Sequence, residues 1–257
     1  MSYFYFDETI RERGNFIIGA LVVSEHDLSP IVSEQWHRLG LNPESAEYKS
    51  SDPKENSKFG VVQRQIMAEL LQRSKLALTV APVSERLRLG EYCTDLLIQL
   101  ADTGFLQEGE HVLYLDQNIR LVLGDIERLR DLNISPFPGS DSKKVGGIQV
   151  ADHAAHALGG MLLEEMGLIT KQVRAGENSG YPPDDLLELG FELWASLRYA
   201  LIGRNEYIEG LSPHPDDPAN PYFRIDGVGL HVASTCSETL IQQARSRFGV
   251  NYLGCIH

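Results

Sequence analysis

The stretch YFYFDET, residues 3–9, runs from four aromatic and apolar positions into two carboxylates, Asp7 and Glu8. Aromatic residues favour strands, so the stretch predicts a buried strand that ends in acid. The next apolar stretch, NFIIGALVV at 15–23, is rich in β-branched residues, and a charged loop containing Gly14 separates the two. We therefore expect the chain to open with a hairpin of two antiparallel strands.

A second apolar run ends in the same way as the first. HVLYLDQN, residues 111–118, indicates another buried strand, and this one leads to Asp116. A helix expected over 148–166 carries Asp152 among apolar neighbours, where an ionised carboxylate needs a partner. Three acids thus fall in parts of the chain that the pattern predicts to be buried.

The order of the expected elements indicates the fold class. Strands are expected at 2–8, 15–23, 76–83 and 111–118, with a short extended piece at 134–137, and helices at 27–39, 61–73, 86–101, 119–132, 148–166 and 185–202. This order predicts an α/β fold with a mixed β-sheet flanked by helices. Residues at strand ends line one crevice in such sheets. Asp7 and Asp116 meet there if their strands are parallel neighbours, and Asp152 reaches the crevice from a helix packed over it.

A shared acidic site gives a chemical reason for acid at the end of a buried strand. Clustered carboxylates repel one another unless a cation neutralises them. Ligand sets made only of oxygen suit Mg²⁺ or Mn²⁺ better than a soft metal. Two such ions about 3.5–4 Å apart activate a water and stabilise the leaving oxygen of a phosphodiester. For one acid taken alone, the competing interpretation is a turn-forming or helix-capping Asp.

Four segments resemble the RNase H-like proteins grouped as "domain of unknown function 3800". YFDET at 5–9 resembles the family's strand ending in Asp-Glu-Ser-Gly, and LYLDQN at 113–118 resembles its second acidic strand. DSKKVGGIQVADHAAHAL at 141–158 resembles its Asp-Ser segment and Gln-x-x-Asp helix, and EYKSS at 47–51 its Glu-x-Lys segment. The resemblance spans roughly the first two-thirds of the chain and implies an RNase H-like fold.

The resemblance also implies roles for particular residues. The metal-binding acids it implies are Asp7, Asp116 and Asp152, with Glu8 and Glu47 as additions. The resemblance implies that Lys49 faces the substrate or orders the acids. The alternative interpretation of Glu47 is a solvated loop residue. The chain departs from the family at Thr9 and Ile10, where the family commonly has Ser and Gly.

The charge of the chain bears on its partners. A net charge of −13 and a pI near 5.0 do not suit a protein whose whole surface holds polyanions, because phosphate affinity comes largely from Lys and Arg. A nucleic-acid partner, RNA or DNA, therefore needs locally placed basic groups. The candidates are Arg11, Arg13, Lys49, Lys54, Lys58, Lys143 and Lys144. Solvated loop charges are the alternative interpretation of these residues.

The sequence also predicts a location and a cysteine chemistry. No stretch approaches the roughly 18 consecutive apolar residues of a membrane helix, so we expect no membrane partner. The start of the chain lacks the basic and apolar regions of a secretory signal, which predicts a cytoplasmic protein. Cys93, Cys236 and Cys255 are widely spaced and form no CxxC pair, so we interpret them as structural or incidental.

The chain is expected to divide near residue 166. We expect residues 1–166 to form the RNase H-like core, and 167–257 a mainly helical, loop-rich extension packed on it, which serves as a lid, a homodimer surface or a surface for another protein. HPDD at 214–217 resembles the zinc motif of sugar N-deacetylases. Its position late in the chain, within a proline-rich stretch, favours a loop instead.

Three functions remain open at this point. The first is a Mg²⁺- or Mn²⁺-dependent nuclease that hydrolyses phosphodiesters of RNA or DNA, with Asp7, Asp116 and Asp152 holding the metal and Glu47 and Lys49 completing the catalytic set. The second is a catalytically inactive RNase H-like module that binds a metal or a partner. The third is an unrelated small-molecule hydrolase.

Overall fold

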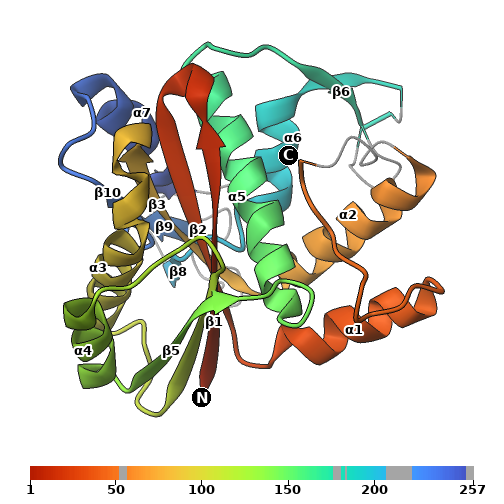
Figure 1. Ribbon diagram of the computed structural model, residues 1–257. Helices are drawn as coiled ribbons and strands as arrows, with labels where there is room; N and C mark the ends of the chain where they lie inside the picture. The colour runs from red at the N-terminus through yellow and green to blue at the C-terminus, as the bar shows by residue number, and fades with distance from the viewer. Residues whose placement is uncertain (52–56, 176–180, 183, 207–221, 253–257) are drawn as a thin grey trace.

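The chain folds around a central mixed β-sheet (Figure 1). The computed structural model describes residues 1–51, 57–175, 181–182, 184–206 and 222–252. The sheet has six strands in the order β10-β3-β2-β1-β4-β5. Their bounds are β1 Ser2–Arg11, β2 Phe16–Ser24, β3 Lys75–Pro82, β4 His111–Asp116, β5 Ile134–Ser140 and β10 Leu230–Val232. β2 is antiparallel to both β1 and β3, whereas β1, β4 and β5 run parallel to one another.

Helices cover both faces of this sheet, as the sequence predicts for an α/β fold. The helices are α1 Leu28–Arg38, α2 Lys58–Gln72, α3 Leu89–Asp102, α4 Leu123–Asp131, α5 Gly146–Glu165, α6 Leu189–Leu197 and α7 Glu238–Phe248, with short 3-10 turns η1 Glu12–Gly14 and η3 Val83–Arg88. In Figure 1, α3 and α4 lie to the left of the sheet, and α1, α2 and α5 to its right. Each face has its own hydrophobic cluster. The prediction of a mixed sheet flanked by helices is confirmed.

The alternation of side chains in β1 explains its central position. Phe4 and Phe6 point into the cluster formed with α3 and α4, whereas Tyr5 points into the cluster formed with α5. All three side chains are fully buried. A strand that is apolar on both faces needs cover on both faces, which a position in the middle of the sheet supplies.

β1 does not end at its acids, contrary to the sequence interpretation. It continues to Arg11, and its pairing with β2 runs on to the couple Arg11–Phe16. Thr9 and Ile10 are β-branched residues, which favour an extended backbone. Asp7 therefore lies within a strand, and it is the neighbouring strand β4 that ends, at Asp116.

The fourth helix begins later than the predicted residue 119. The chain from 117 to 122 is a non-helical loop, and α4 starts at Leu123. This loop lies directly on the start of α3, where a Cβ added at Gly90 would meet the carbonyl oxygen of Arg120 at 2.0 Å. Tight packing of the loop on α3 thus replaces the first turns of the expected helix.

Residues after 166 contribute to the same sheet and core. β10 pairs with β3, and side chains of α6 and α7, among them Trp194, Leu240 and Phe248, belong to the cluster around α5. Two small sheets complete this region, with strands β6 Gln172–Arg174, β7 Leu186–Glu188, β8 Arg204–Glu206, β9 Tyr222–Asp226 and β11 Val250–Tyr252. The helix expected at 185–202 spans only Leu189–Leu197. The division into two domains at residue 166 stays a prediction.

Two further expectations concern cysteines and membranes. Cys93 and Cys236 are buried and free, and Cys255 lies outside the described residues. Within the described part of the chain, no helix is both long and apolar enough for a membrane span.

A glycine sets how closely α5 approaches the sheet, and this gives a testable expectation. A Cβ on Gly147 would lie 2.3 Å from the buried ring of Tyr5, so Gly147→Ala should destabilise the fold by about 1–3 kcal/mol. A Cβ on Gly124 of α4 would meet no described atom within 4 Å, so Gly124→Ala should stabilise the fold by about 0.4–1 kcal/mol. Urea unfolding of both variants measures the two changes, and equal effects would contradict this packing.

Candidate functional site

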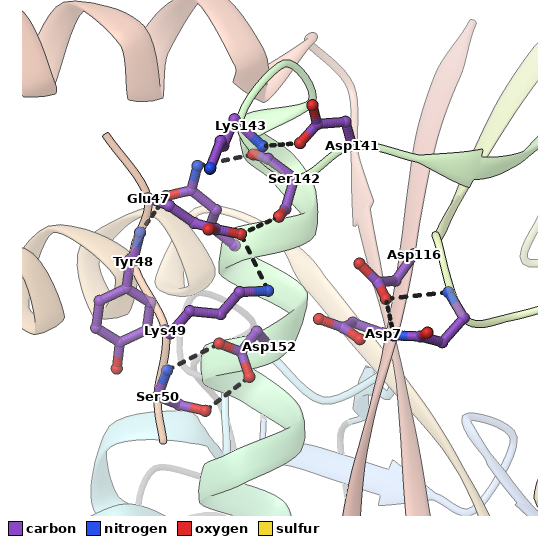
Figure 2. Close-up of polar contacts among 12 residues, drawn as sticks. Asp7, Glu47, Tyr48, Lys49, Ser50, Asp116, Asp141, Ser142, Lys143 and Asp152 are labelled. Atoms are coloured by element: carbon purple, nitrogen blue, oxygen red, sulfur yellow. Dashed lines mark hydrogen bonds and ion pairs between the residues drawn. The ribbon is translucent and has the colours of Figure 1, made fainter. Parts of the chain in front are cut away.

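The parallel pairing of β1 with β4 places two acids side by side. Phe6 pairs with Leu115, so the next residues in the same register are Asp7 and Asp116. Their side chains lie next to each other in Figure 2, and the two residues are 6% and 4% exposed. One oxygen from each of these acids and one from Glu8 lie within 4.8 Å of one another. We call Asp7 and Asp116 the acidic pair.

Protein donors satisfy only part of the acidic pair and Glu8. Oδ1 of Asp7 accepts from the backbone N–H of Glu8 at 2.7 Å, and Oδ2 of Asp116 accepts from the side chain of Asn118 at 3.2 Å. Glu8 forms an ion pair with Arg86 at 3.1 Å through Oε1. Oδ1 of Asp116 and Oε2 of Glu8 are buried and have no hydrogen-bond partner among the described residues. Buried oxygens without a donor are costly and fit a hard cation.

The electrostatics of the site centre on Asp7. Burial raises the pKa of Asp7 well above its ordinary value, and the negative charges of Asp116, Asp152 and Glu8 raise it further. The hydrogen bond from the backbone of Glu8 opposes this rise. A positive charge at this position would favour the ionised carboxylate, since an opposite charge lowers an acid's pKa.

Asp152 faces the site from α5 but is engaged by the chain itself. Its Oδ2 accepts from the backbone N–H of Ser50 at 2.8 Å, and its Oδ1 accepts from the Ser50 hydroxyl at 2.6 Å (Figure 2). The partner that a carboxylate on this apolar helix needs is thus a serine. Asp152 lies outside the group formed by Glu8 and the acidic pair, although its charge acts on Asp7.

Glu47 and Lys49 form an ion pair of 3.0 Å between Oε1 and Nζ. The hydroxyl of Ser142 donates to the same Glu47 oxygen. Partial burial alone would lower the pKa of Lys49, but Glu47 raises it through its hydrogen bond and charge, and Asp7 and Asp152 add to the rise. Figure 2 shows Lys49 between Glu47 and Asp152. Its positive charge is therefore held among the predicted acids.

Helix α5 fixes the segment that carries these residues. Oε1 of Gln149 accepts from the backbone N–H of Tyr48 at 2.8 Å, and Nε2 of Gln149 donates to the carbonyl of Ser142 at 2.8 Å. The hydroxyl of Tyr48 lies 3.1 Å from Nδ1 of His153. The Gln-x-x-Asp spacing thus serves to hold residues 48 and 50 against the helix.

The structure also brings in side chains that the sequence did not single out as site residues. Ser50 and Ser142 bind predicted acids through their hydroxyls, and Arg86 neutralises Glu8. Arg11, considered before only as a basic group, donates from Nη2 to the carbonyl of His156 at 2.6 Å and is attracted by Asp152. Ser50 and Ser142 lie in the segments at 47–51 and 141–158 that resemble the family, and this was the one sequence signal for them. A contact between residues far apart in the sequence leaves no local pattern.

Some sequence predictions fall on residues that the structure leaves out. Lys54 and the segment HPDD at 214–217 lie outside the described residues. The remaining predicted acids and Lys49 divide into the acidic pair with Glu8, and the cluster of Glu47, Lys49 and Asp152. Their catalytic and metal-binding roles stay predictions.

Comparisons with known proteins add no family to these observations. The sequence matches no protein-family model and no curated protein.

The buried imidazole of His153 predicts a pH-dependent stability. Burial, followed by the charges of His156 and Arg64, lowers the pKa of His153 from 6.5 to about 4. A depressed pKa in the folded state contributes stability above the unfolded pKa, and this stability is lost as the pH falls from 6.5 through about 4. We expect His153→Gln to flatten the acid decline, removing about 1 kcal/mol of it by roughly pH 5.5.

Urea unfolding at a series of pH values measures this decline. His26→Gln, a change at an exposed histidine, is the matched control and should leave the slope of the parent chain unchanged. Parallel pH profiles for His153→Gln and the parent chain would show that His153 does not set the acid limit.

Proposed function

We propose that this chain is a Mg²⁺- or Mn²⁺-dependent nuclease with an RNase H-like fold, acting on RNA or DNA. The observation that carries the proposal is the acidic pair, two buried carboxylates from neighbouring parallel strands with a third acid, Glu8, within ligand distance. The mixed sheet and the acid-bearing helix α5 packed on it are consistent with an RNase H-like α/β fold.

The residues present fit a hard divalent cation. The three acids supply oxygen ligands alone, the donor type that Mg²⁺ and Mn²⁺ prefer. Two of their oxygens, on Glu8 and Asp116, are buried without a hydrogen-bond partner in the described part of the chain. The mutual repulsion that raises the pKa of Asp7 is a cost that bound positive charge would relieve.

The chemistry divides between the cation and the chain. A divalent cation held by Asp7, Asp116 and Glu8 would activate a water and stabilise the leaving oxygen of a phosphodiester. Asp116 is fixed by Asn118, and Glu8 is fixed by Arg86, so both carboxylates are preorganised. Lys49 places a positive charge beside the acids, where it can attract a substrate phosphate despite the net charge of −13.

One observation favours a second function, an RNase H-like module that binds a metal or partner without cleaving it. Both oxygens of Asp152 accept hydrogen bonds from Ser50. Asp152, which the family resemblance implies as a metal ligand, is therefore engaged by the chain and does not join the acidic pair. Cytoplasmic location and a homodimer or protein partner stay predictions.

Replacing Asp7 separates cation binding from folding. The raised pKa of Asp7 means that stability present at low pH is lost as the pH rises through the folded-state pKa, so ionisation of Asp7 in the folded chain costs stability. Without a metal, Asp7→Asn should raise the midpoint of thermal unfolding by about 2–4 °C for each kcal/mol of repulsion removed.

Thermal unfolding with and without Mn²⁺ completes this test. A ligand that binds only the folded state stabilises it, so Mn²⁺ should raise the midpoint of thermal unfolding of the parent chain. Asp7→Asn should lose most of that gain. Asp102→Asn, a change at an exposed acid at the end of α3, is the control and should keep the gain. Equal Mn²⁺ shifts for the two variants would refute a metal site at the acidic pair.

A cleavage assay tests the nuclease itself. Parent chain with Mn²⁺ should cut labelled single-stranded RNA or DNA, and Asp116→Asn should lower the rate by at least about 100-fold while keeping the fold, because it removes a ligand and a charge. Mn²⁺ binding without cleavage of RNA, DNA or their hybrid would favour the inactive module.

A further inference from the structure

A row of stacked aromatic rings leads from the core to the surface beside the acidic pair. The rings of Tyr5 and Tyr114 are stacked with centroids 5.7 Å apart and an angle of 12° between their planes. Tyr114 and Phe137 are stacked with centroids 5.4 Å apart and an angle of 28°. Tyr5 is fully buried, whereas Phe137 is 49% exposed. We call these three residues the aromatic row.

The row lies on the same face of the sheet as the acidic pair. Tyr5 and Tyr114 are register partners, as are Tyr114 and Phe137, so the row crosses β1, β4 and β5. Asp7 and Asp116 come two residues later on β1 and β4, about 6–7 Å along the strands. Helix α5 covers Tyr5, whose ring touches Gly147, but the outer strand β5 remains largely exposed.

The sequence of β5 argues against an added strand as the occupant of this edge. Pro136 and Pro138 flank Phe137, and proline offers no N–H to a strand pairing with the edge. Prolines also restrict the backbone, so Phe137 is presented on a stiff support. An exposed aromatic ring on such a support is typical of surfaces that stack the bases of single-stranded nucleic acid.

A basic pocket lies at the inner end of the row. The turn after β5 carries the exposed residues Lys143 and Lys144, which line a pocket of about 270 Å³ together with Asp27 and Trp36. Oδ1 of Asp27 accepts from the hydroxyl of Tyr5 at 2.9 Å, which joins the pocket to the row.

The polar lining of this pocket suits a phosphate group. Oδ1 of Asp27 also accepts from the backbone N–H of Ser29, so this oxygen of the carboxylate in the pocket wall is engaged by the protein. The wall also holds the polar side chains of Ser29, Ser33 and Gln149, and its two lysines outweigh the single charge of Asp27. The pocket therefore has a local positive charge on an acidic protein.

We propose that the aromatic row and the pocket lined by Lys143 and Lys144 bind an unpaired stretch of nucleic acid next to the acidic pair. A base stacks on Phe137, and a phosphate of the same strand contacts the two lysines. This inference rests on the proposed nuclease function and narrows its substrate to single strands, because paired bases do not offer their faces to an aromatic ring.

Binding is tested on the Asp7→Asn chain, which keeps the probe from being cut. Fluorescence anisotropy compares a labelled oligothymidine or oligouridine with a blunt duplex of the same length. Phe137→Ala should weaken single-strand binding by about 5- to 100-fold. Phe59→Ala, a change at a phenylalanine 41% exposed on α2, is the matched control and should leave binding unchanged.

The lysines are tested through the salt dependence of the same binding. Lys143→Gln with Lys144→Gln should reduce the slope of log K against log salt by about 0.7, as expected for the loss of one single-strand phosphate contact. Lys75→Gln with Lys171→Gln removes the same charge at exposed positions elsewhere and should leave the slope unchanged.

The outcomes separate this inference from the nuclease proposal. Absent binding, equal binding of duplex and single strand, or no effect of Phe137→Ala overturns the inference even if the parent chain cuts nucleic acid. Single-strand binding that depends on Phe137 and both lysines supports it, even if the parent chain with Mn²⁺ cuts nothing, in which case only the nuclease proposal fails.

Discussion

The parallel register of β1 on β4 is the constraint on which the site depends. It places Asp7 beside Asp116 in the interior of a sheet that buries both. Ionised carboxylates in such a position repel each other and lose their hydration, so the rest of the fold must supply the stability that they remove. The fully buried aromatic side chains of the same strand, Phe4 and Phe6, contribute to that stability through a separate cluster on the opposite face.

Helix α5 organises the second half of the site from one of its faces. Gln149, Asp152 and His153 follow the i, i+3, i+4 spacing of neighbours on a helix surface. All three contact residues between Tyr48 and Ser50, far away in the sequence. The segment is therefore anchored at three points, and Asp152 has a structural role that holds whether or not it binds a metal.

The sequence allowed those parts of the site to be predicted that depend on local pattern. Apolar runs ending in Asp7 and Asp116 indicated two strands. The α/β fold class then predicted that the two acids line the same crevice at the strand ends. The continuation of β1 to Arg11 was not predicted, because it depends on pairing with β2. The hydrogen bonds of Asp152 with Ser50 were not predicted either, since the two residues are 102 positions apart and share no local period.

The addition of β10 to the sheet has a consequence for the synthesis of the chain. β10 pairs with β3, whose opposite edge is paired with β2. On the β10 side, β3 forms hydrogen bonds with Gly229 and Ala233, which flank β10. Those residues leave the ribosome long after β3 does. During that interval β3 presents an apolar strand with an open edge, the kind of surface through which nascent chains associate. The edge of β3 is therefore completed only after residue 233 has emerged, which makes the order of synthesis part of the folding problem of this sheet.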